Sequence, residues 1–243
     1  MEANDVVESF MEVTNGEINA VDEYQVFVEI ISSEIVKPCD DEVGNCEHYD
    51  EVNVVSAEKL GSHNCGASII GSSWVLTAAH CEDGLSLSWM SFRVGSSIRE
   101  SGGSVLQASS GFQNEIFTLN AQAVVLPSDG YDPAGGLAVT VTGWGDTRTG
   151  GPAAANLQKV DISIVDRNAC RNIFAKTNTV TDRMVCAGQA GHSVCNGDSG
   201  GPLVSGNTQV GIVSWGSRTC ESTPGVYANV FNLRSWIRSA VGI

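Results

Sequence analysis

A serine lies in a glycine-flanked turn that could support nucleophilic catalysis. The segment 197–202 reads GDSGGP and carries Ser199 at its centre. In such a turn the backbone N–H groups of Gly197 and Ser199 can converge on one point and stabilise the negative charge of a tetrahedral intermediate. We therefore expect Ser199 to be the nucleophile and to form an oxyanion hole together with Gly197.

A histidine follows an apolar run elsewhere in the chain. The segment 77–81 reads TAAHC and places His80 at the end of a run with strand character. An imidazole that titrates near neutrality can take the serine proton during attack and return it to the leaving group. A glycine-rich turn alone is more often only a turn, and a single histidine is more often a core residue. Found together, Ser199 and His80 favour acyl-transfer chemistry.

The segments that must position these residues have β character. Short runs rich in Val, Ile and Thr are separated by glycine, and one run alternates apolar with polar residues, which is typical of strands. Only the end of the chain, 232–241, has the spacing of a helix, with Arg234 and Arg238 suited to its C-terminal dipole. The predicted fold is therefore all-β. The predicted strand segments are 68–77, 138–144, 160–165, 210–215 and 225–230.

The charge is distributed unevenly along the 243 residues. The chain has a formal net charge of −15, which argues against nucleic acid or an anionic membrane as the main partner. Residues 1–60 hold 16 acidic residues but only Lys37 and Lys59 as bases, so they carry −14, whereas residues 61–243 carry −1. Of the 27 glycines, 25 also lie beyond residue 60. We expect a boundary near Gly61 between an acidic leader of uncertain structure and a globular body.

The cysteine content indicates an oxidising compartment. Eight cysteines are many for a chain of this size in the reducing cytosol, so we expect an extracellular, secreted protein. The first residues do not read as a secretory signal, which conflicts with this expectation. No apolar run reaches the about 18 residues that would indicate a membrane-spanning helix.

Together with further motifs, the serine and histidine segments carry a family resemblance. VTGWG at 141–145, VSWG at 213–216 and PGVY at 224–227 resemble the trypsin and chymotrypsin family of serine endopeptidases. The resemblance implies two antiparallel β-barrels with a C-terminal helix. We expect an incomplete first barrel at 61–127 carrying His80, and a second barrel at 128–243 carrying Ser199.

The same resemblance implies the partners and the disulfide pairing. Protein or peptide substrates, protein protease inhibitors, a monomer and no cofactor are expected. The implied disulfides are Cys65–Cys81, Cys170–Cys186 and Cys195–Cys220, and each loop of this size contributes about 3 kcal/mol. Ser205 stands where many members have a further cysteine. Cys39 and Cys46, with His48 and His63, have poor spacing for zinc, so a local disulfide or free thiols are favoured and no metal is expected.

The primary specificity pocket is also implied by the resemblance. Its base lies six residues before the nucleophile, at Ser193, and its walls are Gly216 and Gly225. A neutral base cannot offset the desolvation of a Lys or Arg side chain, and glycine walls leave room for a flat ring. We expect chymotrypsin-like cleavage after Phe, Tyr, Leu or Trp. Ser214, Trp215 and Gly216 are expected to pair with the substrate backbone.

Two features of the family are missing. An aspartate normally orients the histidine, but the chain has no aspartate between Asp83 and Asp129, and Glu115 lies too near the following strand to replace it. No Ile-Val-Gly-Gly start occurs in residues 1–64 to supply the ammonium that pairs with the aspartate before the nucleophile, here Asp198. Loss of the orienting aspartate costs about 10⁴ in turnover in a serine–histidine–aspartate triad.

Two functions of different classes follow. The first is a serine endopeptidase of chymotrypsin-like specificity that is impaired in this form. The second is a catalytically silent homologue that binds peptides or a partner protein through the retained cleft. The presence of His80, Ser199 and the pocket residues favours the first as the class description, whereas the missing aspartate and activation start favour the second for this chain.

Overall fold

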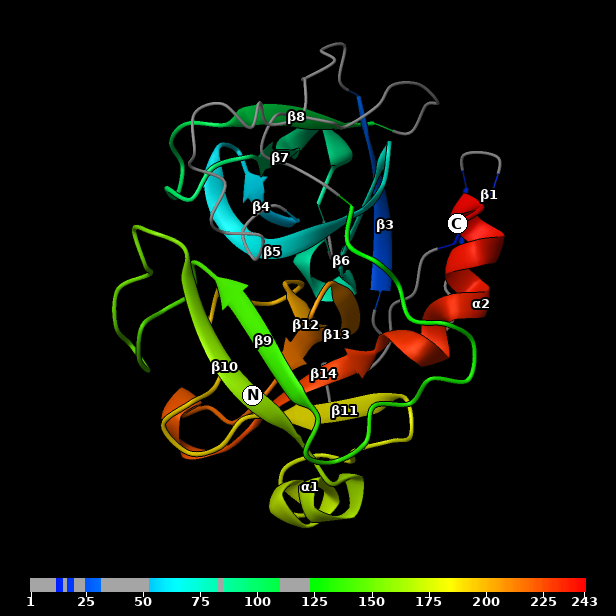
Figure 1. The fold of residues 1–243 in the computed structure, drawn as a ribbon. Helices are drawn as coiled ribbons and strands as arrows, with labels where there is room; N and C mark the ends of the chain where they lie inside the picture. Colours follow the sequence, from blue (N-terminus) through cyan, green and yellow to red (C-terminus); the bar gives the residue numbers. More distant parts are fainter. Residues whose placement is uncertain (1–11, 15–16, 20–24, 32–52, 83–84, 110–122) are drawn as a thin grey trace, which may run out of the picture.

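The computed structural model describes residues 12–14, 17–19, 25–31, 53–82, 85–109 and 123–243. Two six-stranded antiparallel barrels lie one above the other, and a C-terminal helix lies beside them (Figure 1). The all-β prediction with two barrels and a C-terminal helix is confirmed. No helix in the described ranges is long and apolar enough to cross a membrane.

The first barrel is closed by six strands in the order β3-β6-β5-β4-β7-β8. It was expected to be incomplete, but two of its strands come from residues before Gly61, so that expectation is corrected. Its elements are β3 (Gln25–Ile31), β4 (Val54–Lys59), β5 (Ser62–Gly71), β6 (Trp74–Ala78), β7 (Met90–Val94) and β8 (Ser104–Ser109), with 3-10 turns η2 (Ala79–Cys81) and η3 (Leu87–Trp89). A separate pair, β1 (Glu12–Thr14) and β2 (Glu17–Asn19), forms a two-stranded sheet.

The compositional break at Gly61 coincides with a tight hairpin turn. Leu60 and Gly61 connect β4 to β5 with φ angles of +53° and +83°. A two-residue turn with both φ angles positive matches the twist of the flanking strands, and Gly61 adopts this conformation at little cost. The change in charge and glycine content therefore lies inside the first barrel, at the tip of the β4–β5 hairpin.

The second barrel has the strand order β10-β11-β14-β13-β12-β9. Alternate residues of β9 and β10 contribute to the apolar interior, whereas β11 and β14 are buried along their whole length, with Leu203 and Tyr227 fully buried in the interior. The elements are β9 (Ala138–Gly143), β10 (Gln158–Val165), α1 (Arg167–Phe174), β11 (Met184–Ala187), β12 (Pro202–Ser205), β13 (Thr208–Trp215), η4 (Cys220–Ser222), β14 (Gly225–Asn229) and α2 (Val230–Val241).

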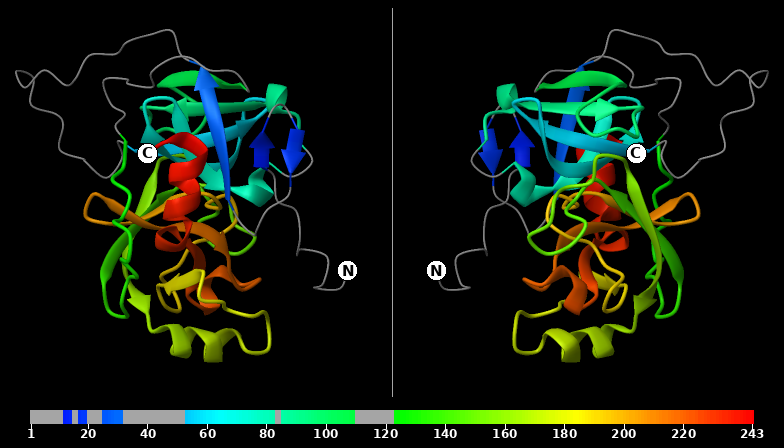
Figure 2. Two further views of the ribbon diagram at one scale, coloured as in Figure 1. Left: turned by 90° about the vertical axis from the view of Figure 1, so that its right-hand side faces the viewer. Right: turned by 90° about the vertical axis from the view of Figure 1, so that its left-hand side faces the viewer.

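Helix α2 runs from the second barrel along the side of the first (Figure 2). Asn229 caps its start by accepting a hydrogen bond from the N–H of Phe231, and Gly242 ends it in the left-handed conformation. Ile237 packs into an apolar cluster that takes Leu76 from the first barrel and Ile212 from the second. The helix and this cluster hold the barrels together.

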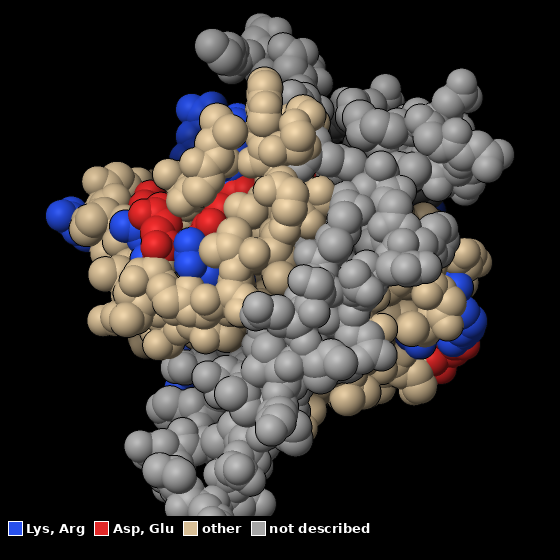
Figure 3. Space-filling view, turned by 90° about the horizontal axis from the view of Figure 1, so that it is seen from above, with Lys and Arg blue, Asp and Glu red and all other residues tan. Residues whose placement is uncertain are grey.

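Acidic and basic side chains are interspersed on the surface of the described residues. Seen from above the first barrel, acidic and basic residues lie next to one another (Figure 3). Two of the pairs are Glu58 with Arg93, at 2.6 Å, and Glu100 with Arg99, at 3.2 Å. This arrangement agrees with the net charge of −1 for residues 61–243.

Candidate active site

His80 lies where β6 ends and η2 begins. The last four residues of β6 are buried, so the strand holds the start of this turn firmly in the first barrel. The following residue, Cys81, forms a disulfide with Cys65 on β5. The His80 side chain is accessible to solvent, but desolvation by the groups around it lowers its pKa, which keeps the imidazole neutral and able to accept a proton.

The loop with Ser199 packs against the strand that leads to His80. The N–H of Gly66 on β5 donates to the Ser199 carbonyl at 2.8 Å, and the Cys81 sulfur lies 3.7 Å from the same oxygen. Gly200 has a φ of +82°, and a Cβ there would collide with the Thr77 hydroxyl and the Gly66 carbonyl. Close approach of the two barrels thus requires glycine after the serine. Among the described residues, no hydrogen bond joins the His80 ring to the Ser199 hydroxyl.

Gly197, the expected oxyanion glycine, is held in place by His63. The Nε2 atom of His63 lies 3.0 Å from the Gly197 carbonyl oxygen, and its Nδ1 atom lies 2.8 Å from the Ser56 hydroxyl. Burial lowers the pKa of His63, so the neutral ring donates from Nε2 and accepts the Ser56 hydroxyl at Nδ1. The ring also meets Trp144 edge-on, with centroids 5.8 Å apart. This fixes the Gly197 carbonyl and hence the direction of the adjoining N–H groups.

The sequence offered no signal for this role of His63, because it depends on the β4–β5 pairing that brings Ser56 close. Both ring nitrogens are engaged, so His63 does not offer a free zinc ligand. Cys39, Cys46 and His48, the other residues considered for zinc, lie outside the described residues. The remaining six cysteines form the three disulfides implied by the resemblance: Cys65–Cys81, Cys170–Cys186 and Cys195–Cys220.

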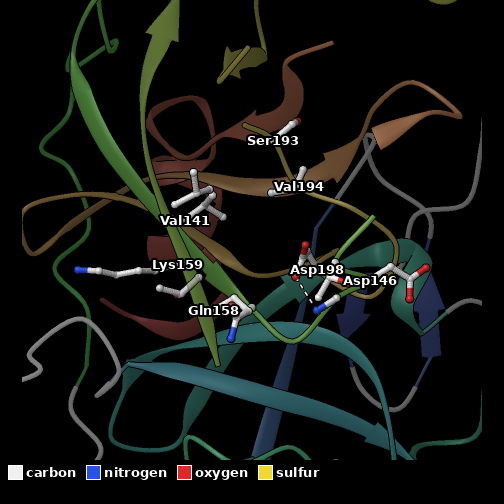
Figure 4. Close-up of a pocket in the computed structure, with 12 residues that line it drawn as sticks. Val141, Asp146, Gln158, Lys159, Ser193, Val194 and Asp198 are labelled. Carbon is white, nitrogen blue, oxygen red and sulfur yellow. Dashed lines mark hydrogen bonds between the residues drawn. The ribbon is translucent and has the colours of Figure 1, made fainter. Parts of the chain in front are cut away.

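The carboxylate of Asp198 is buried beside a cavity of about 190 Å³. It accepts hydrogen bonds from the N–H groups of Gly145, at 2.8 Å, and Cys195, at 2.9 Å. Burial raises its pKa from 3.8 to about 6, and the nearby Asp146 adds to the effect. Lys159 also lines the cavity, but its ammonium group points away from Asp198 (Figure 4). Among the described residues, no salt bridge neutralises this carboxylate.

The expected pocket residues gather around the end of β13 and the start of β14. Trp215 pairs with Val226 after a bulge that follows Val213, and the Trp215 ring meets Phe174 edge-on at 5.0 Å. A Cβ on Gly216 would meet nothing within 4 Å, so this wall is open. Ser214 is buried beside Trp215.

The expected wall at Gly225 is bordered by Val194 and Tyr227, to which the sequence analysis gave no role in the pocket. A Cβ on Gly225 would lie 2.8 Å from Val194 Cγ2 and 3.2 Å from the Tyr227 hydroxyl. Val194 follows Ser193, the expected base, and both border the cavity next to Asp198 (Figure 4). The spacing of Tyr227 from Gly225 was a possible signal, because alternate residues of a strand face the same side.

No carboxylate in the described residues orients His80. Desolvation is the only influence on the His80 pKa among them. Glu82 is close in sequence, but burial raises its pKa to about 8, so it is protonated at neutral pH. Glu115 lies outside the described residues. Strand β3 reaches this end of the barrel, with Gln25 opposite Ala78, two residues before His80.

Comparisons with known proteins agree with this geometry. The protein-family model Trypsin matches residues 44–114 and 104–237. Trypsin alpha-4 of Lucilia cuprina is 39% identical over 206 residues, which are 76% of this chain and 81% of the relative. Trypsin Blo t 3 of Blomia tropicalis is 39% identical over 204 residues, covering 73% of this chain and 77% of the relative.

A solved structure shares the fold. Neuropsin, described as a serine protease expressed in the limbic system of mouse brain, superposes with a TM-score of 0.65 and 27% identity. The match covers 78% of this chain and 94% of neuropsin. With two closed barrels, a glycine-flanked serine loop packed against the histidine turn, and these sequence matches, the chain belongs to the trypsin and chymotrypsin family of serine proteases.

Proposed function

We propose that this chain is a serine endopeptidase that cleaves after large apolar residues and has low activity in the form described. The observation that carries the proposal is the packing of the Ser199 loop against the end of β6. The hydrogen bond from Gly66 to the Ser199 carbonyl and the contact with Cys81 connect the nucleophile to the turn that carries His80.

The reaction uses groups of this chain alone. Ser199 Oγ attacks the substrate carbonyl carbon while His80 takes its proton, and the oxyanion is stabilised by the N–H groups of Gly197 and Ser199. The tetrahedral intermediate then expels the amine, which receives the proton from His80. A water molecule attacks the resulting acyl-enzyme with the same proton transfers and releases the acid.

The pocket supports a preference for apolar side chains. Ser193 is neutral, and the Val194 side chain adds apolar surface next to Gly225. Burying a lysine or arginine side chain against such groups is costly. The open backbone at Gly216 leaves room for a ring, and the edge beside Trp215 is available to pair with a substrate strand.

Two observations support low activity. His80 has no orienting carboxylate among the described residues, and a triad that loses this group turns over about 10⁴-fold more slowly. Asp198 is buried without a salt bridge to a described cation, although it lies directly before the nucleophile. A buried carboxylate without a counter-charge disfavours the loop conformation on which the oxyanion hole depends.

The second candidate function is peptide or protein binding by the same cleft without hydrolysis. The lack of a carboxylate partner for His80 among the described residues favours it, because binding requires the pocket and the backbone edge but not a working base. Protein or peptide ligands, including protein protease inhibitors, suit either function. Three disulfides favour an extracellular location, and we expect a monomer without metal or cofactor.

The test is labelling of Ser199 by an aryl phosphonate that reacts with activated serines. The purified chain is incubated with the reagent, and the site is identified by mass spectrometry, with Ser199→Ala as the matched control. We expect slow labelling that the control abolishes. If labelling is absent, or occurs equally in the Ser199→Ala variant, the endopeptidase proposal is wrong. Retained peptide affinity would then support the binding function.

A further inference from the structure

Glu221 connects three loops of the second barrel, and the proposed reaction gives it no role. Its carboxylate accepts hydrogen bonds from the Thr149 N–H, at 2.7 Å, and from the Thr149 hydroxyl, at 2.6 Å. Its backbone carbonyl accepts a hydrogen bond from the N–H of Gly191 at 2.9 Å. The η4 turn is thereby joined to the β9–β10 loop, which carries Thr149, and to the loop that leads to Ser193.

The residue before Glu221 takes part in the same network. The N–H of Cys220 donates to the Thr149 hydroxyl oxygen at 2.8 Å, so this hydroxyl accepts from Cys220 and donates to Glu221. We call the hydrogen bonds among Thr149, Gly191, Cys220 and Glu221 the Glu221 clamp.

The clamp connects the segments that provide the expected base and walls of the specificity pocket. Gly191 lies two residues before Ser193, the expected base, and Cys220 lies in the chain between Gly216 and Gly225, the expected walls. A disulfide joins the same two segments, and the clamp adds a second connection that includes the β9–β10 loop. The position of the base relative to the walls therefore depends on both connections.

The Glu221 carboxylate is charged when it makes these contacts. The two hydrogen bonds from Thr149 lower the pKa of Glu221, and the guanidinium of Arg148 adds to the effect, so the carboxylate is ionised at neutral pH. Hydrogen bonds to an ionised acceptor are stronger than those between neutral groups. Because Glu221 is exposed, we expect the clamp to order these loops rather than to add much to the free energy of unfolding.

We propose that Glu221 is a positioning residue that sets the affinity of the pocket for substrate by holding its base and walls at a fixed spacing. This inference rests on the proposed endopeptidase function and assigns a determinant of its substrate binding. If the loops must be ordered when the substrate binds, the free energy of ordering them reduces the affinity. Loss of the clamp leaves Ser199 and His80 in place, so binding should weaken while the chemical step keeps its rate.

The experiment separates binding from chemistry in the labelling of Ser199. The concentration of an aryl phosphonate with a phenylalanine side chain is varied, which gives the half-saturating concentration and the maximal labelling rate. The control is Asp161→Ala, because Asp161 is also an exposed carboxylate that accepts a threonine hydroxyl, that of Thr140, at 2.7 Å. In Glu221→Ala we expect the half-saturating concentration to rise about fivefold, as the loss of a hydrogen bond predicts, with an unchanged maximal rate. The control should keep both wild-type values.

The outcomes separate this inference from the endopeptidase proposal. An unchanged half-saturating concentration in Glu221→Ala, a change confined to the maximal rate, or an equal rise in Asp161→Ala overturns the inference and leaves the endopeptidase proposal standing. If the wild type is not labelled at Ser199, the endopeptidase proposal fails, and the affinity of N-acetyl-phenylalaninamide, measured by calorimetry in the same variants, decides the inference. Absence of binding to the wild type overturns it.

Two further variants test whether the effect passes through Thr149. Glu221→Gln keeps an oxygen that can accept from the Thr149 N–H, so it should recover part of the affinity lost in Glu221→Ala. Thr149→Val combined with Glu221→Ala should weaken binding no more than Glu221→Ala alone, because both changes remove the same network. Additive losses, or no recovery in Glu221→Gln, overturn the inference.

Amide hydrogen exchange tests the clamp without any labelling of Ser199. Segments 146–151 and 217–222 should exchange faster in Glu221→Ala than in the wild type, whereas segment 158–165 in β10 should exchange at the same rate. Wild-type exchange in both loop segments would show that Glu221 does not order them, which overturns the inference.

Discussion

The buried carboxylate of Asp198 should make the stability of this protein depend on pH in an unusual direction. Most buried carboxylates in proteins are paired, and protonating them is destabilising. Asp198 accepts two backbone hydrogen bonds but has no salt bridge with a described cation, and burial raises its pKa from 3.8 to about 6. The folded state therefore binds the proton more tightly than the unfolded state.

The size of the effect follows from that pKa. A rise from 3.8 to about 6 corresponds to about 3 kcal/mol, because each pH unit is worth about 1.4 kcal/mol. This stabilisation is fully present below pH 3.8 and is lost as the pH rises to and through about 6. Asp198→Asn does not titrate, so the wild-type minus variant free energy of unfolding should fall by about 3 kcal/mol between pH 3.5 and pH 8.

Urea unfolding followed by tryptophan fluorescence measures this difference at several pH values. Other titrating groups, Glu82 among them, are present in both proteins and cancel in the difference. As a control, the same difference is measured with Asp146→Asn present in both proteins. Its fall with pH should then be smaller, because Asp146 contributes to the raised pKa of Asp198. A wild-type minus Asp198→Asn difference that stays flat, or rises with pH, would refute the reasoning.

Two further predictions concern the loop that carries Ser199. His63→Phe removes the hydrogen bond to the Gly197 carbonyl, so Ser199 labelling should slow at least tenfold and urea stability should fall by about 1–3 kcal/mol; labelling at the wild-type rate would contradict the positioning role. Gly145→Ala places a Cβ 2.5 Å from the Asp198 carboxyl carbon, so urea unfolding should show a loss of about 1–3 kcal/mol, and no loss would show that the loop can move aside.

Local patterns predicted the parts of the site that depend on neighbours in sequence. Ser199 needs glycine beside it because Gly200 packs directly against Thr77 and Gly66, and this need is visible as GDSGGP. The β13 and β14 segments were predicted from their Val, Ile and Thr content. Helix α2 begins at Val230, two residues before the predicted start, because Asn229 provides the cap. Helix α1 was missed, because its eight residues are too few to show a clear period.

Long-range contacts could not be predicted in the same way. Nothing in the types of Ser56 and His63 indicates that their pairing supports Gly197 in the other barrel, because that depends on strand register and barrel contact. The closing of the first barrel also depends on a distant segment, β3, which pairs with β6 and β8. Composition separated residues 1–60 from the rest, yet pairing joins part of them to the body.

The position of β3 has a consequence for handling and truncating this protein. The strand precedes β4 in sequence but lies between β6 and β8, so it closes the first barrel. A chain shortened beyond residue 31 would leave both neighbours with exposed backbone N–H and C=O groups. Open strand edges of this kind recruit strands from other molecules. Removing the acidic segment as dispensable would therefore favour aggregation, even though every residue of the serine and histidine motifs would remain.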